Sequence, residues 1–327
     1  MSGATPDPET LAAALRAGEL GVAPAVLNLV ESRTPASRAA TAELLHRLSP
    51  AELGGEAAGH IVGLTGPPGV GKSTLLSRLV TEWRGRERSV AVLAVDPSSR
   101  RSGGSLLGDR ARIEVDPRDR RTFVRSAAAG EQLGGLAPAT RAAAAALAVA
   151  FDVVVIETVG VGQSEIEVAD VADSVAVVVQ PGSGDVLQFL KAGIMEVPDV
   201  LVVTKADLGR VATRAMADLR AALRSLGVRE TAVVAVSSVP PPRGVDTLAD
   251  AVETHRMTLD LPARRLRARR MHALADFTAE HGLRGLRALG SRRGAERLLA
   301  AQSPGLDVPA LTEMLAEHAG RNEAQSS

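Results

Sequence analysis

Between residues 60 and 255 the chain alternates short apolar runs with longer amphipathic segments. The apolar runs are rich in β-branched residues and cover 60–65, 89–95, 151–156, 174–179, 199–203 and 231–236, with a weaker run at 122–124. Helical spacing of apolar residues is found between most of them, for example over 138–150 and 210–226. Because the apolar runs are continuous rather than alternating, we expect strands that are buried on both faces. The pattern therefore predicts an α/β fold, with a mostly parallel β-sheet flanked by helices.

Helical segments flank this alternating region on both sides. Short amphipathic pieces precede it, separated by Gly21, Pro24 and Pro35, and predict an N-terminal helical extension over 1–57. The α/β core is then expected over 58–260, and a C-terminal helical arm over 261–327. The arm is rich in arginine, with apolar residues between the arginines. This mixture favours a solvated face on a packing or dimerisation helix over a helix that binds nucleic acid.

Composition narrows the class of protein. The 327 residues contain 38 Lys and Arg and 38 Asp and Glu, so no global charge favours nucleic acid or a membrane surface. The absence of cysteine excludes disulfides, thiolate metal sites and cysteine nucleophiles, and it suits a cytoplasmic location. No apolar run approaches the ~20 residues of a membrane span. The N-terminus also lacks the basic region of a signal peptide.

A glycine-rich stretch follows the first apolar run and opens a helical segment. It reads Gly66-Pro67-Pro68-Gly69-Val70-Gly71-Lys72-Ser73-Thr74 and fits the pattern G-x-x-x-x-G-K-[ST]. Glycines let successive backbone N–H groups surround a phosphate, and a helix N-terminus adds partial positive charge. Lys72 can then reach the β- and γ-phosphates, while the Ser73 hydroxyl can ligate Mg²⁺. The fold is therefore predicted to be that of a P-loop NTPase, and all nine residues are assigned to nucleotide binding.

Three carboxylates are candidates for the metal side of this site. Glu157 directly follows the apolar run at 151–156, where a parallel sheet presents its ligand-binding edge. We expect it to act on Mg²⁺ directly or through water, and we expect Gly160 to offer a backbone N–H to the γ-phosphate. Asp96 and Asp109 frame a long polar loop after the second run. This loop is interpreted either as a switch that orders around Mg²⁺ or as a solvated surface loop, and spacing alone leaves the two interpretations even.

A second motif predicts the base of the nucleotide. Thr204-Lys205-Ala206-Asp207 closes an apolar run and matches the guanine-specificity motif N-K-x-D, with threonine in place of asparagine. Asp207 would accept hydrogen bonds from guanine N1–H and N2–H₂, which adenine does not supply. Lys205 would lie over the base, and the change at Thr204 is expected to weaken guanine preference somewhat. The turn Ser237-Ser238-Val239 is assigned to the same site, with backbone N–H groups offered to guanine O6.

These motifs resemble one family in their order and length. The matching stretches are Gly66 to Thr74, Asp96 to Ser99, Gly103 to Asp109, Glu157 to Glu165 and Lys191 to Glu196. They occur in the order found in MeaB/ArgK-type GTPases, the chaperones of methylmalonyl-CoA mutase and related adenosylcobalamin-dependent mutases. The resemblance runs through the core from about residue 60 to 255, and the helical flanks are similar to the family's as well.

The resemblance implies a function beyond nucleotide binding. It implies GTP hydrolysis coupled to an acyl-CoA mutase, with gating of adenosylcobalamin loading and protection or reactivation of the mutase. It implies a homodimer whose C-terminal helices form the dimerisation arm. It also implies an additional switch over Pro181 to Lys191, in which Gln188 and Lys191 sense nucleotide and contact the partner. Departures such as Arg100 and Arg101 leave the identity of the mutase open.

The expected reaction is attack of water on the γ-phosphate of GTP, giving GDP. Lys72 would neutralise developing charge together with Mg²⁺, which Ser73 would hold with Asp109 or Glu157. Gln163 is a candidate for orienting the water. Three alternatives remain: a metal-insertion GTPase, a small-molecule or protein kinase, and a scaffold that binds nucleotide without turnover. The lack of cysteine and the six scattered histidines disfavour the first of these.

Overall fold

The computed structural model describes residues 7–96, 113–128, 136–158, 164–182, 198–225, 227 and 231–326. By its internal contacts the chain forms two compact units. One unit comprises Gly59–Leu259, and the other comprises Met1–Ala58 together with Asp260–Ser327. The two helical segments that the sequence predicts as separate extensions are thus grouped in a single unit.

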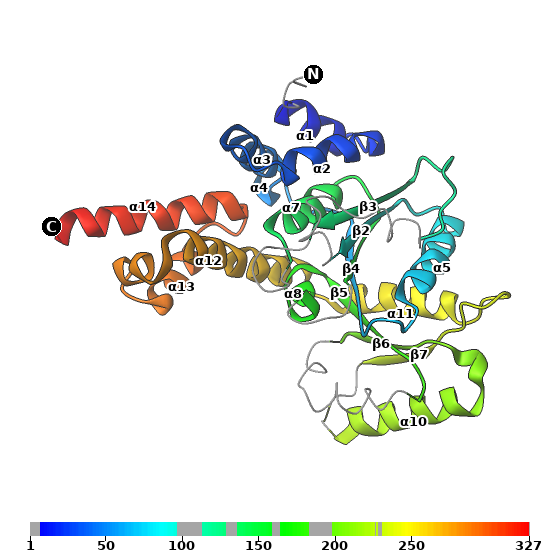
Figure 1. Cartoon of the computed structure of the whole chain (residues 1–327). Coiled ribbons are helices and arrows are strands. Elements are labelled where there is room, and N and C mark those ends of the chain that lie inside the picture. Colours follow the sequence, from blue (N-terminus) through cyan, green and yellow to red (C-terminus); the bar gives the residue numbers. More distant parts are fainter. Residues whose placement is uncertain are drawn as a thin grey trace. The chain divides into compact units, whose positions relative to one another are not determined.

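A parallel β-sheet forms the centre of the first unit (Figure 1). Its described strands are β1 (His60–Thr65), β2 (Val90–Asp96), β3 (Thr122–Ala128), β4 (Val153–Thr158), β5 (Ser174–Val179), β6 (Val200–Val203) and β7 (Ala232–Ala235). They are arranged in the order β3-β2-β4-β1-β5-β6-β7, and every pair is parallel. The predicted fold class is confirmed.

Edge position explains the one strand that was predicted too short. The weak run at 122–124 belongs to β3, which continues to Ala128 and pairs with β2 along its length. Residues 122–126 are only half-buried, because β3 lies at the edge of the sheet. Backbone pairing therefore extends this strand beyond the point where its hydrophobicity ends.

Helices cover both faces of the sheet. Helices α5 (Lys72–Gly85) and α11 (Val245–Thr258) lie on one side, and α7 (Pro138–Leu147) and α8 (Ser164–Val171) on the other (Figure 1). Gly63 shows how closely α8 approaches, because a Cβ added there would lie 2.8 Å from the Val168 side chain. Helix α10 (Arg210–Ser225) contacts β6 and β7.

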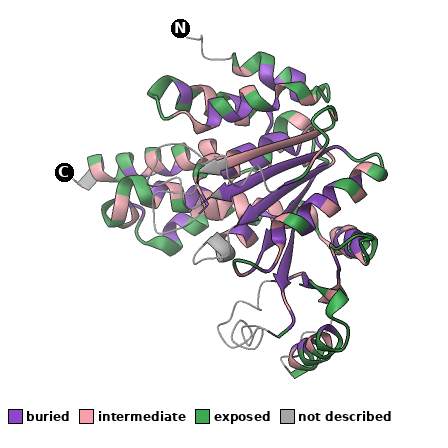
Figure 2. Cartoon of the chain, turned by 45° about the vertical axis from the view of Figure 1, so that its right-hand side comes forward, coloured by how far each residue is buried: buried purple, intermediate pink, exposed green. Residues whose placement is uncertain are grey.

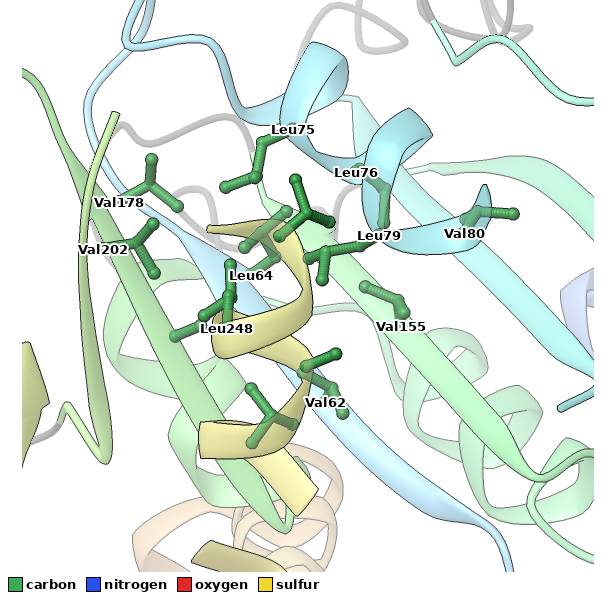
Figure 3. Close-up of a cluster of buried hydrophobic side chains, with 14 of the residues drawn as sticks. Val62, Leu64, Leu75, Leu76, Leu79, Val80, Val155, Val178, Val202 and Leu248 are labelled. Atoms are coloured by element: carbon green, nitrogen blue, oxygen red, sulfur yellow. The ribbon is translucent and has the colours of Figure 1, made fainter. Parts of the chain in front are cut away.

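Branched aliphatic side chains fill the layer between the sheet and α5 and α11. Leu75, Leu76, Leu79 and Val80 of α5 and Leu248 of α11 meet Val62, Leu64, Val155, Val178 and Val202 of the strands (Figure 3). Figure 2 shows the central strands buried along their length, as continuous hydrophobicity predicted. Burial of each such side chain contributes about 1.5–3 kcal/mol before entropy is subtracted. This core fixes β1 and α5, which hold the glycine-rich loop between them.

Aspartates accept the first backbone N–H groups of neighbouring strands at the amino edge of the sheet. Asp173 accepts from Ile61 N–H, and Asp199 accepts from Val175 N–H, both at 2.8 Å. Asp152 accepts from the backbone N–H and the hydroxyl of Ser89, each at 2.7 Å. Burial raises the pKa of Asp152, but these hydrogen bonds outweigh it and the pKa lies below its ordinary value. The backbone N–H groups at the buried starts of these strands are therefore hydrogen-bonded within the protein.

Two histidines and a serine connect the same edge. The fully buried Ser174 hydroxyl lies 2.8 Å from His60 Nε2 and 2.7 Å from His255 Nδ1. His255 Nε2 lies 3.1 Å from Asp199 Oδ1. The network joins the starts of β1 and β5, the residue preceding β6 and the last turn of α11.

The second unit is helical. Its N-terminal part contains α1 (Pro8–Arg16), η1 (Leu20–Val22), α2 (Ala23–Glu31), α3 (Pro35–Arg47) and α4 (Pro50–Leu53). Its C-terminal part contains α12 (Leu261–Ala288), α13 (Arg292–Ala300) and α14 (Val308–Ser326), packed around Leu274, Phe277, Leu299, Leu311 and Leu315. Helix α14 contacts α3. No helix in the described ranges is long and apolar enough to span a membrane.

Several arginines of the tail take part in this packing. Arg269 forms a bidentate pair with Glu56, at 3.0 and 2.8 Å. Arg265 donates to the Ala57 carbonyl at 2.6 Å, and Arg270 to the Ala300 carbonyl at 3.2 Å. These guanidinium groups hold backbone and side chains of their own unit together, which agrees with the packing interpretation of the arginine-rich segment.

Candidate nucleotide-binding site

The glycine-rich loop joins β1 to α5, as the sequence pattern requires. Gly66, Gly69 and Gly71 adopt φ values of 139°, 77° and 94°. Residues other than glycine rarely adopt positive φ values. Gly66 is further constrained, because a Cβ there would lie 2.1 Å from the Val178 carbonyl oxygen. The turn that carries successive N–H groups therefore depends on glycine for its conformation and, at Gly66, for its closeness to β5.

Lys72 and Ser73 begin α5 directly after this loop. Lys72 is 7% exposed, and its Nζ donates to the carbonyl oxygens of Gly66 and Pro67 at 2.6 and 2.9 Å. The Ser73 hydroxyl donates to Glu157 Oε1 at 2.8 Å. The sheet order explains this meeting, because β4 lies beside β1 and Glu157 is in register with Leu64. The structure thus brings together the loop lysine, the loop serine and the carboxylate that the sequence assigned to one site.

Two threonines join β1 and β4 beneath the loop, which sequence reasoning missed. The Thr158 hydroxyl donates to the Thr65 hydroxyl at 2.8 Å, and both side chains are at most 2% exposed. Each residue lies at the carboxyl end of its strand, one before Gly66 and one after Glu157. The sequence does show a threonine next to each motif, but only the strand order shows that the two threonines contact each other.

Thr204 connects the base-recognition motif to the glycine-rich loop. Its buried hydroxyl lies 2.8 Å from the Val70 carbonyl oxygen and 3.1 Å from that of Val179. One hydroxyl hydrogen is shared between two acceptors, whereas an asparagine amide has two hydrogens to donate. The threonine still ties the end of β6 to the loop.

Lys205 and Asp207 follow at the end of β6. Lys205 is one of the few non-glycine residues with a positive φ, at 53°, and its ammonium donates to the Gln180 side-chain carbonyl. Asp207 lies in the short helix η4 (Ala206–Leu208) and is exposed. Its Oδ1 accepts from the Ser237 hydroxyl at 2.9 Å. The carboxylate is therefore braced from behind by Ser237 while it remains accessible.

The turn at residues 237–239 differs from its expected role in one respect. The Ser237 backbone N–H, expected to face guanine O6, instead donates to the Arg243 carbonyl at 3.0 Å. The two residues form an isolated antiparallel bridge, so this N–H is engaged within the protein. The part of Ser237 that reaches the site is its hydroxyl. The Ser238 carbonyl accepts from Arg78 at 3.3 Å, and Val239 is 57% exposed.

Several predicted positions lie outside the described residues. They are Asp109, Gly160, Gln163, Gln188 and Lys191, and the side chain of Asp96 belongs with them. Within the described part of the chain, no group of three or more His, Cys, Asp or Glu residues is placed to hold a metal ion. Ser73 and Glu157 are the two predicted metal-side residues that the structure places together.

The chain is similar to known GTPases along most of its length. Residues 23–285 match the family described as "Methylmalonyl Co-A mutase-associated GTPase MeaB". A probable GTPase of Mycobacterium bovis is 42% identical over 291 residues, covering 85% of this chain and 84% of the relative. A methylmalonic aciduria type A homolog, mitochondrial, of Caenorhabditis elegans is 39% identical over 212 residues. That alignment covers 62% of this chain and 53% of the relative.

A solved structure extends the similarity to the fold. The crystal structure of an LAO/AO transport system kinase matches with a TM-score of 0.64 at 27% sequence identity, covering 97% of this chain and 98% of that chain. The P-loop geometry, the strand order and the family match over residues 23–285 agree with one another. The resemblance seen in the sequence motifs is confirmed, and the chain belongs to the MeaB family of methylmalonyl-CoA mutase-associated GTPases.

Proposed function

We propose that this GTPase acts as a chaperone of an adenosylcobalamin-dependent acyl-CoA mutase, whose cofactor loading it gates and which it protects or reactivates. The family description and the name of the C. elegans relative support an association with methylmalonyl-CoA metabolism. As a member of a GTPase family the chain hydrolyses GTP. The coupling to a mutase rests on the family, whereas the hydrolytic chemistry can be argued from side chains.

The observation that carries the hydrolytic assignment is the Ser73–Glu157 pair at the start of α5. A hydroxyl and a carboxylate oxygen lie 2.8 Å apart beside the loop, and Mg²⁺ prefers such oxygen ligands. We therefore assign Mg²⁺ to Ser73 and Glu157, with contact to Glu157 either direct or through water. When bound, the ion would offset negative charge on the phosphate oxygens.

Lys72 provides the second positive charge. Its ammonium already lies on the loop, held by the Gly66 and Pro67 carbonyls. A triphosphate bound to the loop would offer anionic acceptors in place of these neutral carbonyls, so the ammonium would gain ion pairing as well as hydrogen bonds. The lysine would then stabilise charge that develops as water attacks the γ-phosphate.

Guanine selection is assigned to Asp207. Its carboxylate is an acceptor that matches guanine N1–H and N2–H₂, and adenine presents no donor pair there. The Ser237 hydroxyl restrains the carboxylate at 2.9 Å. Thr204 couples this end of the site to the Val70 carbonyl, so base and phosphate recognition share one framework.

The deciding experiment measures phosphate release from GTP and from ATP, alone and with purified cobalamin-dependent mutases. We expect GTP to be preferred and turnover to rise several-fold with one mutase. Asp207→Ala should remove the preference, whereas Asp218→Ala, at an exposed position on α10, should preserve it. Equal use of ATP would favour the kinase alternative. The name of the LAO/AO transport system kinase also points to that alternative. Turnover of GTP that no mutase changes would refute the chaperone assignment alone.

We also propose that the protein is a cytoplasmic homodimer that uses its C-terminal helices as the dimerisation arm. Leu283, a large apolar side chain on α12, is 70% exposed and would be available to such a contact. Light scattering after size exclusion should give twice the chain mass, and Leu283→Glu should shift the species toward one chain mass. A monomeric wild-type protein would rule the arrangement out.

A further inference from the structure

Ser77 makes two hydrogen bonds one helical turn beyond Ser73. Its hydroxyl donates to the Ser73 carbonyl at 3.0 Å and accepts from the Glu114 backbone N–H at 2.9 Å. The residue is 4% exposed. A buried hydroxyl that both donates and accepts across two chain segments fixes their separation more tightly than either bond alone.

The partner segment of Ser77 is the return of the chain toward the sheet. Strand β2 ends at Asp96, and the described chain resumes at Ile113, which is 4% exposed within the apolar cluster of α5. Glu114 follows directly. The segment between them contains Asp109, one of the metal-ligand candidates, five residues before Glu114 in the sequence. Ser77 therefore links Glu114, near the start of the described segment, to the turn of α5 that carries Ser73.

A second tie holds the other end of this returning segment. Arg84 Nε and Nη2 donate to Asp119 at 2.5 and 3.1 Å. Ser77, Thr81 and Arg84 share one face of α5. Between the two ties lies a cavity of about 320 Å³, lined by this face and by residues from Glu114 to Thr122. Ile113 and Val115 pack on the apolar cluster on either side of Glu114, and the bond to Ser77 adds a directional contact between them.

We propose that Ser77 is a positioning residue for GTP hydrolysis. Its hydroxyl sets where the segment that begins at Ile113 meets the helix that carries the loop serine. Loss of the hydroxyl frees the Glu114 N–H to bond water and removes the side-chain bond to the Ser73 carbonyl. The effect is expected in the chemical step, since small displacements of catalytic groups are costly there. The core beneath, including Leu75, Leu76 and Leu79, is untouched.

The helix supplies a matched control. The Thr81 hydroxyl donates to the Ser77 carbonyl at 2.9 Å, which is the same back-bond that Ser77 makes to Ser73. Within the described residues Thr81 makes no hydrogen bond to the returning segment. A Thr81→Ala change therefore removes an equivalent helix bond without removing the link. Ser77→Thr keeps the hydroxyl, and its added methyl can enter the neighbouring cavity.

The test compares Ser77→Ala, Thr81→Ala and Ser77→Thr in GTP hydrolysis without a mutase, so its result is independent of the chaperone assignment. We expect Ser77→Ala to lower kcat about tenfold with KM and GDP affinity little changed. Its melting temperature should match that of Thr81→Ala, and Ser77→Thr should restore kcat. If Ser77→Ala retains the kcat of Thr81→Ala, or if Ser77→Thr is as slow as Ser77→Ala, the positioning role is overturned.

Discussion

The two edges of one sheet use their polar groups in opposite ways. At the amino edge, Asp152, Asp173 and Asp199 accept backbone N–H groups of neighbouring strands, and Ser174 links two histidines. At the carboxyl edge, Ser73 and Asp207 are held by Glu157 and Ser237 beside a loop that depends on positive-φ glycines. The first edge satisfies its polar groups within the protein, while the second orders polar groups that recognise a nucleotide.

The polar groups of the amino edge are paired with one another. Asp199 is an acceptor, so the His255 Nε2 that faces it is a donor. The Ser174 hydroxyl lies within hydrogen-bond distance of both rings, and it can donate to one of them while it accepts from the other. Substitutions at this edge should therefore change stability, and substitutions at the carboxyl edge should change turnover.

The largest expected effect is on turnover at the carboxyl edge. Lys72→Ala removes the ammonium that stabilises developing phosphate charge, and we expect GTP hydrolysis to fall about a thousandfold. The free energy of unfolding should change far less, since removing the buried ammonium also removes its desolvation cost, which offsets its bonds to the Gly66 and Pro67 carbonyls. Single-turnover phosphate release and urea unfolding give the two numbers. If Lys72→Ala lowered the free energy of unfolding strongly, the proposed difference between the two edges would be contradicted.

The next effect is on stability at the amino edge. Ser174→Ala removes the buried hydroxyl that bonds both His60 Nε2 and His255 Nδ1, and it should lower the free energy of unfolding by about 2–3 kcal/mol. Turnover per folded molecule should stay unchanged. Ser225→Ala is the control, because that exposed hydroxyl donates to the Ala222 carbonyl of its own helix at 2.7 Å. Equal urea midpoints for the two variants would contradict the stabilising role of the network.

A smaller effect should depend on pH. The hydrogen bonds from Arg84 chiefly lower the pKa of Asp119 from 3.8 to about 2. Because the folded-state pKa is depressed, the pair stabilises the fold above about pH 4, and the contribution disappears as pH falls toward 2. Asp119→Asn should therefore cost up to about 2 kcal/mol at pH 7 and much less near pH 2.5.

Asp116→Asn supplies the control for that titration. Asp116 lies in the same segment and is exposed, and its carboxylate accepts a local bond from Arg118 N–H at 2.9 Å. Its replacement should alter stability by less than about 0.5 kcal/mol at either pH. A destabilisation by Asp119→Asn that persists unchanged at pH 2.5 would show that the ion pair is not its source.

The smallest effect sharpens the carboxyl edge itself. Ser237→Ala removes the hydroxyl that restrains the Asp207 carboxylate but leaves its bonds to guanine in place, so GDP affinity should weaken only about fivefold. Ser238→Ala provides the neighbouring comparison, and the melting temperature should be the same for both. Isothermal titration would settle it: unchanged affinity in Ser237→Ala would mean that Asp207 needs no brace.

Strand positions were largely predictable from hydrophobicity, whereas strand order was not. The runs at 60–65 and 174–179 match β1 and β5 in full, because both strands are buried on two faces. Nothing in a linear pattern places β4 between β2 and β1, since pairing depends on crossovers rather than on local preference. The grouping of the two terminal helical segments was hidden for the same reason.

The site shows the same division. The glycine-rich loop and Asp207 were recognisable because each motif is local and its chemistry demands particular residue types. The Ser73–Glu157 contact required the sheet register as well. Ser237 was assigned through its amide, but the bridge to Arg243 engages that amide and leaves the hydroxyl to contact Asp207. Long-range pairing decides which atom of a motif residue is available.

The central place of β1 also has a consequence for synthesis on the ribosome. Its neighbours are β4, which begins at Val153, and β5, which begins at Ser174. Because synthesis proceeds at about 5–20 residues per second, several seconds pass between the synthesis of β1 and that of either neighbouring strand. A nascent chain should therefore gain nucleotide affinity only after β5 has emerged. The helices before residue 58 wait longer still, because the rest of their unit begins at Asp260.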